Sequence, residues 1–185
     1  MRVRFCGFGG QGIVMAGYIA GQAAVADGKN AIQNQSYGAE SRGGQCKSDV
    51  IIQDGEIYEL ELESVDLLVA MSQAAHDQNI DQLDPDGSLV YDSDLVVPRA
   101  GQRNLHAVPF TDIAFKAFNR KIMGNTVMLG YLVAVANLVS EGAMRDAIVK
   151  NAPKGTEEQN LKAYEKGLEK GRERKLEAPV GSTCK

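Results

Sequence analysis

A glycine-rich segment near the N-terminus constrains the fold more than any other feature. Residues Gly7-Phe8-Gly9-Gly10-Gln11-Gly12 lie between a short strand pattern over residues 1–6 and a run of small and apolar residues over 13–26. That run is typical of a tightly packed helix, and Gly28 is suited to end it. Residues 29–35 predict a second strand, so the chain is expected to begin with a β-α-β unit whose first turn is made of glycines.

The remainder of the chain predicts a single α/β domain. Further strands are expected over residues 46–53, 56–60, 65–71, 88–91 and 104–108, and helices over 72–83, 111–118, 124–139, 141–150 and 157–175. Asp54-Gly55 is a two-residue hairpin signal that predicts antiparallel pairing of the strands on either side. Residues 84–87 (Asp-Pro-Asp-Gly) predict a turn.

The fold class expected from this order is a three-layer α/β/α single domain. It has a mixed, mainly parallel sheet, a Rossmann-like start and a helical C-terminal part. Residues 1–175 are predicted to form the domain and residues 176–185 a flexible tail. Gly167 and Gly171 are expected to weaken the last helix.

Composition excludes several classes of protein. A chain of 185 residues removes roughly 70% of its unfolded surface from water, so it needs no metal or disulfide to fold. The net charge of −4 argues against nucleic-acid binding. The most apolar stretch, residues 124–139, contains Asn125, Thr126 and Asn137 and is shorter than the roughly 20 residues of a membrane span. It predicts a helix buried in a core or against a partner, and no membrane association.

The cysteine and histidine content indicates no metal site in this chain. Cys6, Cys46 and Cys184 are far apart, and only His76 and His106 could join them. This spacing excludes the usual zinc sites and a four-cysteine iron–sulfur cluster within one chain. The histidines are predicted to be surface or packing residues. An odd cysteine count without a signal-peptide pattern predicts a cytoplasmic location.

The segment Gly7–Gly12 matches the pattern GxGxxG, which opens the hypothesis of a stand-alone nucleotide-binding oxidoreductase. Amides at the start of the helix would face a pyrophosphate. However, the second strand ends in Gln33-Asn34-Gln35, without an acidic residue for the ribose. The alternative is a tight strand-to-helix turn that needs glycine for packing. Gln11, at the start of the helix, is expected to be exposed and able to bond a partner or substrate.

A second glycine-rich segment is more distinctive. It spans Ser36-Tyr37-Gly38-Ala39-Glu40-Ser41-Arg42-Gly43-Gly44. Its glycines allow sharp turns and close approach to another surface. Arg42 suits a carboxylate or a phosphate, and Glu40 can pair with it or position it. The favoured interpretation is a salt-bridged loop at an interface, and the other is an anion site for a coenzyme phosphate. No nucleophile has an adjacent base, so no catalytic residue is predicted.

Together the two segments resemble the gamma subunit, or gamma domain, of the 2-oxoacid:ferredoxin oxidoreductases. The family pattern is GxGGQG followed by SYGxExRGG. Asn125 to Gly130 is similar to the family's N-x-x-x-L-G helix start, and Asn160, Ala163 and Gly167 resemble its closing N-x-x-A-x-x-x-G. The resemblance covers residues 1 to about 171.

The resemblance implies a structural subunit of a larger complex, inactive on its own. In this family alpha and beta subunits hold thiamine diphosphate with Mg, and beta or delta subunits carry iron–sulfur clusters. The complex decarboxylates a 2-oxoacid oxidatively, forms an acyl-CoA and reduces ferredoxin. The RGG ending of the second segment is more similar to the 2-oxoglutarate and ketoisovalerate types than to the pyruvate type. This chain is expected to bind none of the cofactors alone, and within the complex to assist coenzyme A binding.

The site predicted for coenzyme binding or subunit contact consists of Gly9, Gly10, Gln11, Gly12, Ser36, Tyr37, Gly38, Glu40, Arg42, Gly43 and Gly44. Two alternatives to a gamma subunit stay open besides the stand-alone nucleotide-binding enzyme. One is the related small subunit of an indolepyruvate:ferredoxin oxidoreductase. The other is a scaffold or regulator without catalytic partners.

Overall fold

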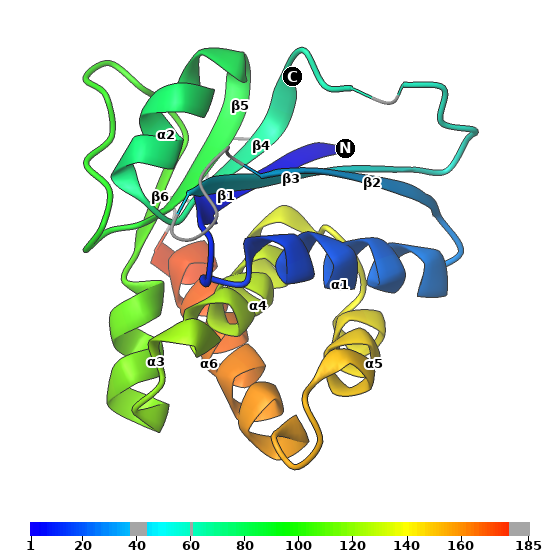
Figure 1. Cartoon of the computed structure of the whole chain (residues 1–185), viewed down its shortest axis with the longest axis vertical. Helices are drawn as coiled ribbons and strands as arrows, with labels where there is room; N and C mark the ends of the chain where they lie inside the picture. The colour runs from blue at the N-terminus through cyan, green and yellow to red at the C-terminus, as the bar shows by residue number, and fades with distance from the viewer. Residues whose placement is uncertain (38–43, 60, 178–185) are drawn as a thin grey trace.

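A six-stranded mixed sheet forms the centre of the molecule (Figure 1). The computed structural model describes residues 1–37, 44–59 and 61–177. The strands follow the order β2-β3-β1-β4-β5-β6 across the sheet. β3 is antiparallel to both β2 and β1, whereas β1, β4, β5 and β6 are parallel. Their bounds are β1 Arg2–Phe8, β2 Asn30–Tyr37, β3 Gln45–Gln53, β4 Val65–Ala70, β5 Leu83–Asp92 and β6 Leu105–Val108.

Helices cover both faces of this sheet, which confirms the three-layer prediction. Helices α1, α3, α4, α5 and α6 lie on one face, and α2 with the 3-10 helix η1 lies on the other (Figure 1). The helix bounds are α1 Ile13–Ala26, α2 Gln73–Asn79, η1 Ile80–Gln82, α3 Phe110–Phe118, η2 Lys121–Met123, α4 Gly124–Ala136, α5 Glu141–Asn151 and α6 Glu157–Glu177.

Side chains that alternate between the two faces of the central strands divide the interior into two hydrophobic cores. Val3 and Phe5 of β1 pack on the face of α1 and α4, whereas Cys6 packs on the face of α2. Successive side chains of a strand point to opposite faces, so one strand serves both cores. Arg4 also lies on the α2 face, where its guanidinium pairs with the Asp49 carboxylate. Apart from Asp66, the residues of β4 are apolar, which is explained by helices that cover both faces of the sheet.

Helices α4 and α6 approach each other closely because glycines stand at their contact. A Cβ on Gly167 would lie 1.9 Å from the Val127 carbonyl oxygen, and one on Gly130 would lie 2.1 Å from that of Tyr164. Helix α6 nevertheless runs through both Gly167 and Gly171, the positions expected to weaken it, as far as Glu177. The missing side chain at Gly167 permits the close contact with α4, and packing of this kind supports a helix of low intrinsic propensity. Helix α4 itself is core, as its apolar sequence predicted.

The predicted hairpin at Asp54-Gly55 is not formed. Residues 56–59 have no strand structure. Both edges of β3 are already paired, with β2 on one side and β1 on the other, so no edge is open to a further strand. The antiparallel part of the mixed sheet thus comes from β3 lying between β1 and β2.

The turn predicted over residues 84–87 lies inside β5. Val65 of β4 pairs with Leu83, and Leu67 pairs with Ser88, so the extra residues form an irregularity within the strand pair. Turn-forming residues are accommodated there as a bulge. Within the described ranges, no helix is long and apolar enough to cross a membrane.

Candidate functional site

The glycine turn lies at the point where the chain changes from one face of the sheet to the other. β1 leads into α1 on one face, whereas the neighbouring parallel strand β4 leads into α2 on the opposite face. After the carboxyl ends of these two neighbouring strands, the chain therefore continues to opposite faces of the sheet. In open α/β sheets this divergence is the usual place for a ligand or a functional contact.

Gln11 joins the two strands at this point. Its side-chain Oε1 accepts a hydrogen bond from the Phe8 amide at 2.6 Å, and its Nε2 donates to the Met71 carbonyl at 2.8 Å. The expectation of an exposed Gln11 is thus wrong: the residue is half-buried, and both ends of its amide are engaged within the chain. Its position in the turn makes it a clamp between the end of β1 and the end of β4.

Backbone conformation explains two of the glycines. Gly10 has φ +99° with no atom near the place of a Cβ, and Gly12 has φ +74°. Such values favour glycine. A Cβ on Gly12 would also lie 2.0 Å from the Asn125 Nδ2, which is 3.5 Å from the Gly12 carbonyl oxygen. The Asn125 motif at the start of α4 is therefore a support for the glycine turn, a role that the sequence had not suggested.

The two glycine-rich segments touch each other. The Gly9 amide donates a hydrogen bond of 2.9 Å to the Gly44 carbonyl. Ser36 is exposed on β2 and pairs with Lys47 of β3, next to Tyr37 at the end of the strand. We call the edge formed by residues 8–12, 36–37 and 44 the glycine edge. Gly38, Glu40, Arg42 and Gly43 lie outside the described residues.

Removal of the Gln11 side chain is expected to loosen the glycine edge. The Gln11→Ala variant loses two hydrogen bonds, so its free energy of unfolding should fall by about 1–3 kcal/mol. Denaturant unfolding measures this change. Gln159→Ala is the control, because Gln159 is exposed on α6, and its change should stay within about 0.5 kcal/mol. Equal stability of the two variants would contradict the clamp.

The arrangement differs from a dinucleotide-binding fold in two respects. β3 lies between β1 and β2, so the end of β2 is one strand further from the turn than in that fold. In addition, the Phe8 amide at the end of β1 already donates its hydrogen bond to the Gln11 side chain. This donor next to the turn is therefore not free to bind a ligand. The sequence match to GxGxxG is therefore explained by a packed strand-to-helix turn.

The histidines and the described cysteines serve packing. His76 is buried, with Nδ1 2.8 Å from the Asp77 carboxylate, and His106 Nδ1 lies 2.9 Å from the Tyr131 hydroxyl. Burial lowers the pKa of His106 and raises the pKa of the Cys6 thiol to about 12, so this thiol stays protonated and unreactive. In the part of the chain that the structure describes, no cluster of three potential metal ligands occurs. Cys184 lies outside that part.

Fold and site together define an α/β domain with a glycine edge at the switch point and, among its described residues, no metal-binding cluster of its own. A family model described as pyruvate ferredoxin/flavodoxin oxidoreductase matches residues 2–170. The chain therefore belongs to the pyruvate ferredoxin/flavodoxin oxidoreductase family.

Relatives of this family match nearly the whole chain. The 2-oxoglutarate synthase subunit KorC of Methanocaldococcus jannaschii is 44% identical over 176 residues, covering 92% of this chain and 94% of that protein. The gamma subunit of keto/oxoacid ferredoxin oxidoreductase from Geobacter sulfurreducens has a TM-score of 0.81 and 40% identity, covering 92% of this chain and 97% of that one.

A third relative places the same domain in a longer chain. Ketoisovalerate oxidoreductase subunit VorA of Methanothermobacter thermautotrophicus is 33% identical over 177 residues, which are 94% of this chain and 37% of that protein. Together these findings confirm the resemblance to gamma subunits of 2-oxoacid:ferredoxin oxidoreductases. They also confirm that the chain is one subunit of a larger oxidoreductase.

Proposed function

We propose that this chain is the gamma subunit of an oxidoreductase that acts on 2-oxoglutarate. The complex would decarboxylate the oxoacid oxidatively, transfer the acyl group to coenzyme A and pass the electrons to ferredoxin. The 44% identity to a 2-oxoglutarate synthase subunit, against 33% to a ketoisovalerate relative, supports this substrate. Purified complex assayed with 2-oxoglutarate, 2-oxoisovalerate and pyruvate tests it. Faster turnover of either other acid would contradict the assignment.

Within the complex we assign the chain a structural role and a contribution to coenzyme A binding. The supporting observation is the hydrogen bond between Gly9 and Gly44, which joins the glycine turn to the last residue of the second glycine-rich segment. Gly9 and Gly10 are exposed there, and no atom lies near the place of a Gly10 Cβ, so another surface can approach the backbone closely. Lys47, beside Ser36, adds a positive charge. These features fit an anionic group such as a coenzyme phosphate.

Thiamine diphosphate, Mg and the iron–sulfur clusters are assigned to the other subunits. The described residues contain no cluster of metal ligands that would hold them. The free, buried Cys6 and Cys46 are consistent with a reducing compartment, and we propose the cytoplasm. Residues 1–175 are proposed as the domain that joins the complex and residues 176–185 as a tail. Helix α6 reaches Glu177, two residues into that tail.

Replacement of Arg42 tests the role of the glycine edge. In the assembled complex, Arg42→Ala should raise the KM for coenzyme A about tenfold, because one charge-assisted hydrogen bond contributes about 1.5 kcal/mol or more. The KM for the oxoacid should stay unchanged. Arg103→Ala is the control, since Arg103 is exposed and forms no ion pair with any described residue. Unchanged coenzyme A affinity together with unchanged assembly would refute the role of Arg42.

A further inference from the structure

Helix α1 presents an apolar surface to the outside that begins beside Gly12 of the glycine edge. Met15, Tyr18 and Val25 are 46%, 44% and 59% exposed, and with Gln22 they form one stripe at helical spacing. The 14 residues of the helix include no charged side chain. A helix on a protein surface ordinarily carries charged residues on its outward face. This composition is typical of a helix that is covered on all sides.

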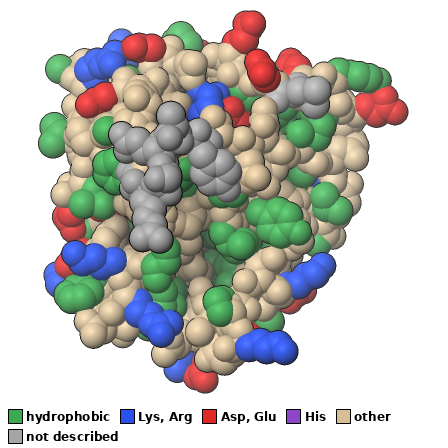
Figure 2. Space-filling model, in the orientation of Figure 1, with side chains coloured by type: hydrophobic (Ala, Val, Ile, Leu, Met, Phe, Trp, Pro, Cys, Tyr) green, Lys and Arg blue, Asp and Glu red, His purple; other side chains and the backbone are tan. Residues whose placement is uncertain are grey.

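Two grooves extend this surface on either side of the stripe. The first has a volume of about 550 Å³ and lies between α1, α5 and β2, lined by Tyr18, Val25, Ala31 and Ala147 among others. The second has a volume of about 260 Å³ and is lined by Met15, Ile122 and Pro153 among others. Figure 2 shows hydrophobic side chains gathered on this face around a hollow. A contiguous exposed apolar patch of this kind marks an interaction surface.

The central tyrosine of the surface is held in position. The Asn151 side chain donates to the Gln22 Oε1 at 2.7 Å, and the Gln22 Nε2 donates to the Tyr18 hydroxyl at 2.8 Å. These bonds fix the ring before any partner arrives, which reduces the entropy lost on association. Tyrosine is also among the residues that contribute most to protein interfaces.

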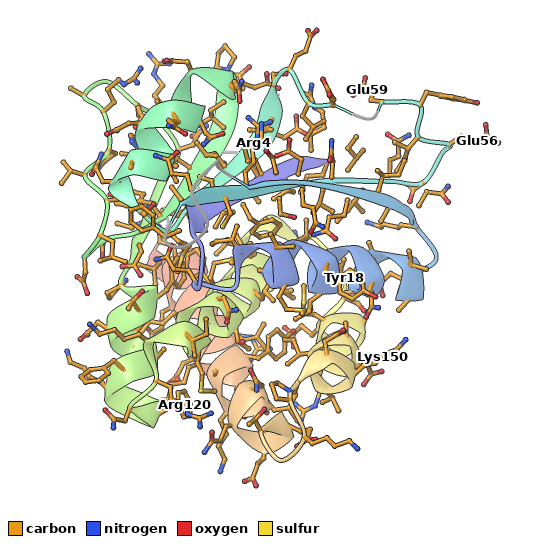
Figure 3. The ribbon with its side chains drawn as sticks, viewed as in Figure 1. Arg4, Tyr18, Glu56, Glu59, Arg120 and Lys150 are labelled. Atoms are coloured by element: carbon orange, nitrogen blue, oxygen red, sulfur yellow. The ribbon has the colours of Figure 1, made fainter. Side chains whose placement is uncertain are left out.

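The charges at the margin indicate what kind of surface fits there. Arg120 lines the second groove and Lys150 the first, and both are exposed without an ion pair to any described residue. Among the described residues, Asp146 is the one acidic residue that lines either groove. Figure 3 shows Tyr18, Arg120 and Lys150 on the same side of the molecule. A twofold contact of this surface with itself would oppose four cations to two carboxylates, which disfavours a second copy of the chain.

We propose that the α1 surface, defined by Met15, Tyr18, Val25, Arg120, Ile122 and Lys150, docks another subunit of the same oxidoreductase. The partner's contacting surface is apolar, with carboxylates at its margin facing Arg120 and Lys150. This inference rests on the proposed function as a gamma subunit, and it adds the face through which that subunit joins. Burial of the α1 stripe supplies the driving force, and the opposed charges set the orientation.

Charge introduction into the stripe tests this inference. Complex is co-produced with a tag on another of its subunits, and the amount of this chain per tagged subunit is measured after size-exclusion chromatography. Val25→Glu and Tyr18→Glu should each weaken incorporation at least tenfold, and Lys150→Glu should weaken it several-fold. Val97→Glu is the control, because Val97 is 76% exposed beside α2 on the other face of the sheet. It should incorporate normally.

The outcomes separate this inference from the proposed function. Each variant chain is first shown to melt at the wild-type temperature, which the exposure of these side chains leads us to expect. Normal incorporation of both Val25→Glu and Tyr18→Glu into an active complex would overturn the docking surface and leave the gamma-subunit assignment intact. Failure of the wild-type chain to incorporate would overturn both. A dimer of the isolated chain that Val25→Glu dissociates would identify a second copy as the occupant and overturn the proposed partner.

Discussion

Replacing Gly167 by valine is expected to lower the free energy of unfolding by at least about 3 kcal/mol, the upper end of the usual cost of overpacking. A Cβ at this position would lie 1.9 Å from the Val127 carbonyl oxygen and 2.8 Å from the Tyr131 amide nitrogen. Both atoms belong to the backbone of α4, so no side chain can rotate away to make room. The two helices must separate, which exposes buried residues such as Tyr164. Denaturant unfolding of the purified chain measures the loss.

Two further glycine variants show whether the helix contact is the cause. Gly130→Ala should also destabilise, because its Cβ would lie 2.1 Å from the Tyr164 carbonyl oxygen. Gly142→Ala is the matched control in α5, where no atom lies within 4 Å of the added carbon. There alanine should be neutral or should stabilise by up to about 1 kcal/mol through its higher helix propensity. A Gly167→Val protein as stable as wild type would show that α4 and α6 do not meet in this way.

Removal of the Asp49 carboxylate is expected to have the second large effect, about 3–5 kcal/mol of lost stability in the Asp49→Ala variant. Arg4 is 1% exposed, and its Nε and Nη2 lie 2.6 and 2.7 Å from the two carboxylate oxygens. Without Asp49, the contacts of the guanidinium with described residues are a 3.2 Å bond to the Leu62 carbonyl and a 3.4 Å contact with Asn79. A buried charge is then left without the carboxylate that pairs with it.

The control for this prediction is removal of both charges. In the double variant Arg4→Met with Asp49→Leu, no buried charge is left, and most of the lost stability should return. The exposed pair Arg145–Glu165 provides a second comparison, since its side chains are 49% and 53% exposed. Glu165→Ala should cost less than about 1 kcal/mol. Similar losses for Asp49→Ala and Glu165→Ala would contradict the importance of burial at the first pair.

Both predictions concern the frame that supports the glycine edge. Arg4 belongs to β1, the strand that ends in the glycine turn, and Asn125 at the start of α4 contacts Gly12. The α4–α6 contact holds this start of α4, since Thr126 donates to the Asn160 side chain at 3.2 Å. Two of the family motifs, around Asn125 and Asn160, are therefore linked by packing. Asn125 contacts the glycine turn at Gly12, and Asn160 supports the start of α4 through Thr126.

Several elements were predictable because their signals are local. Helix α1 has the predicted bounds, residues 13–26, since glycines precede and follow an uninterrupted helical run. The alternating and continuous apolar patterns also located β1 and β4 to within two residues. The family was predictable for a related reason: four short motifs stand in this sequence in the order of the family pattern.

The errors arise where pairing over long distances decides the structure. Asp54-Gly55 has the local chemistry of a hairpin, yet β3 pairs with two strands that precede it in the chain. Gln11 looks exposed in the sequence, because its second partner, Met71, lies 60 residues away. Hydrogen bonds between distant segments satisfy backbone groups that local patterns leave open.

By itself, the sequence determined the type and position of most helices and strands, the two glycine-rich segments and the family. Each of these depends on composition, on residue spacing or on backbone freedom within a few neighbouring residues. Only the tertiary structure decided the strand order, the use of Gln11 and Asn125 to hold the turn, and the close contact of α4 with α6. The tertiary structure also decided that the apolar stripe of α1 stays exposed to solvent in the isolated chain. Those features depend on which distant surfaces meet, because burial and hydrogen bonding reward contacts that no local window of sequence contains.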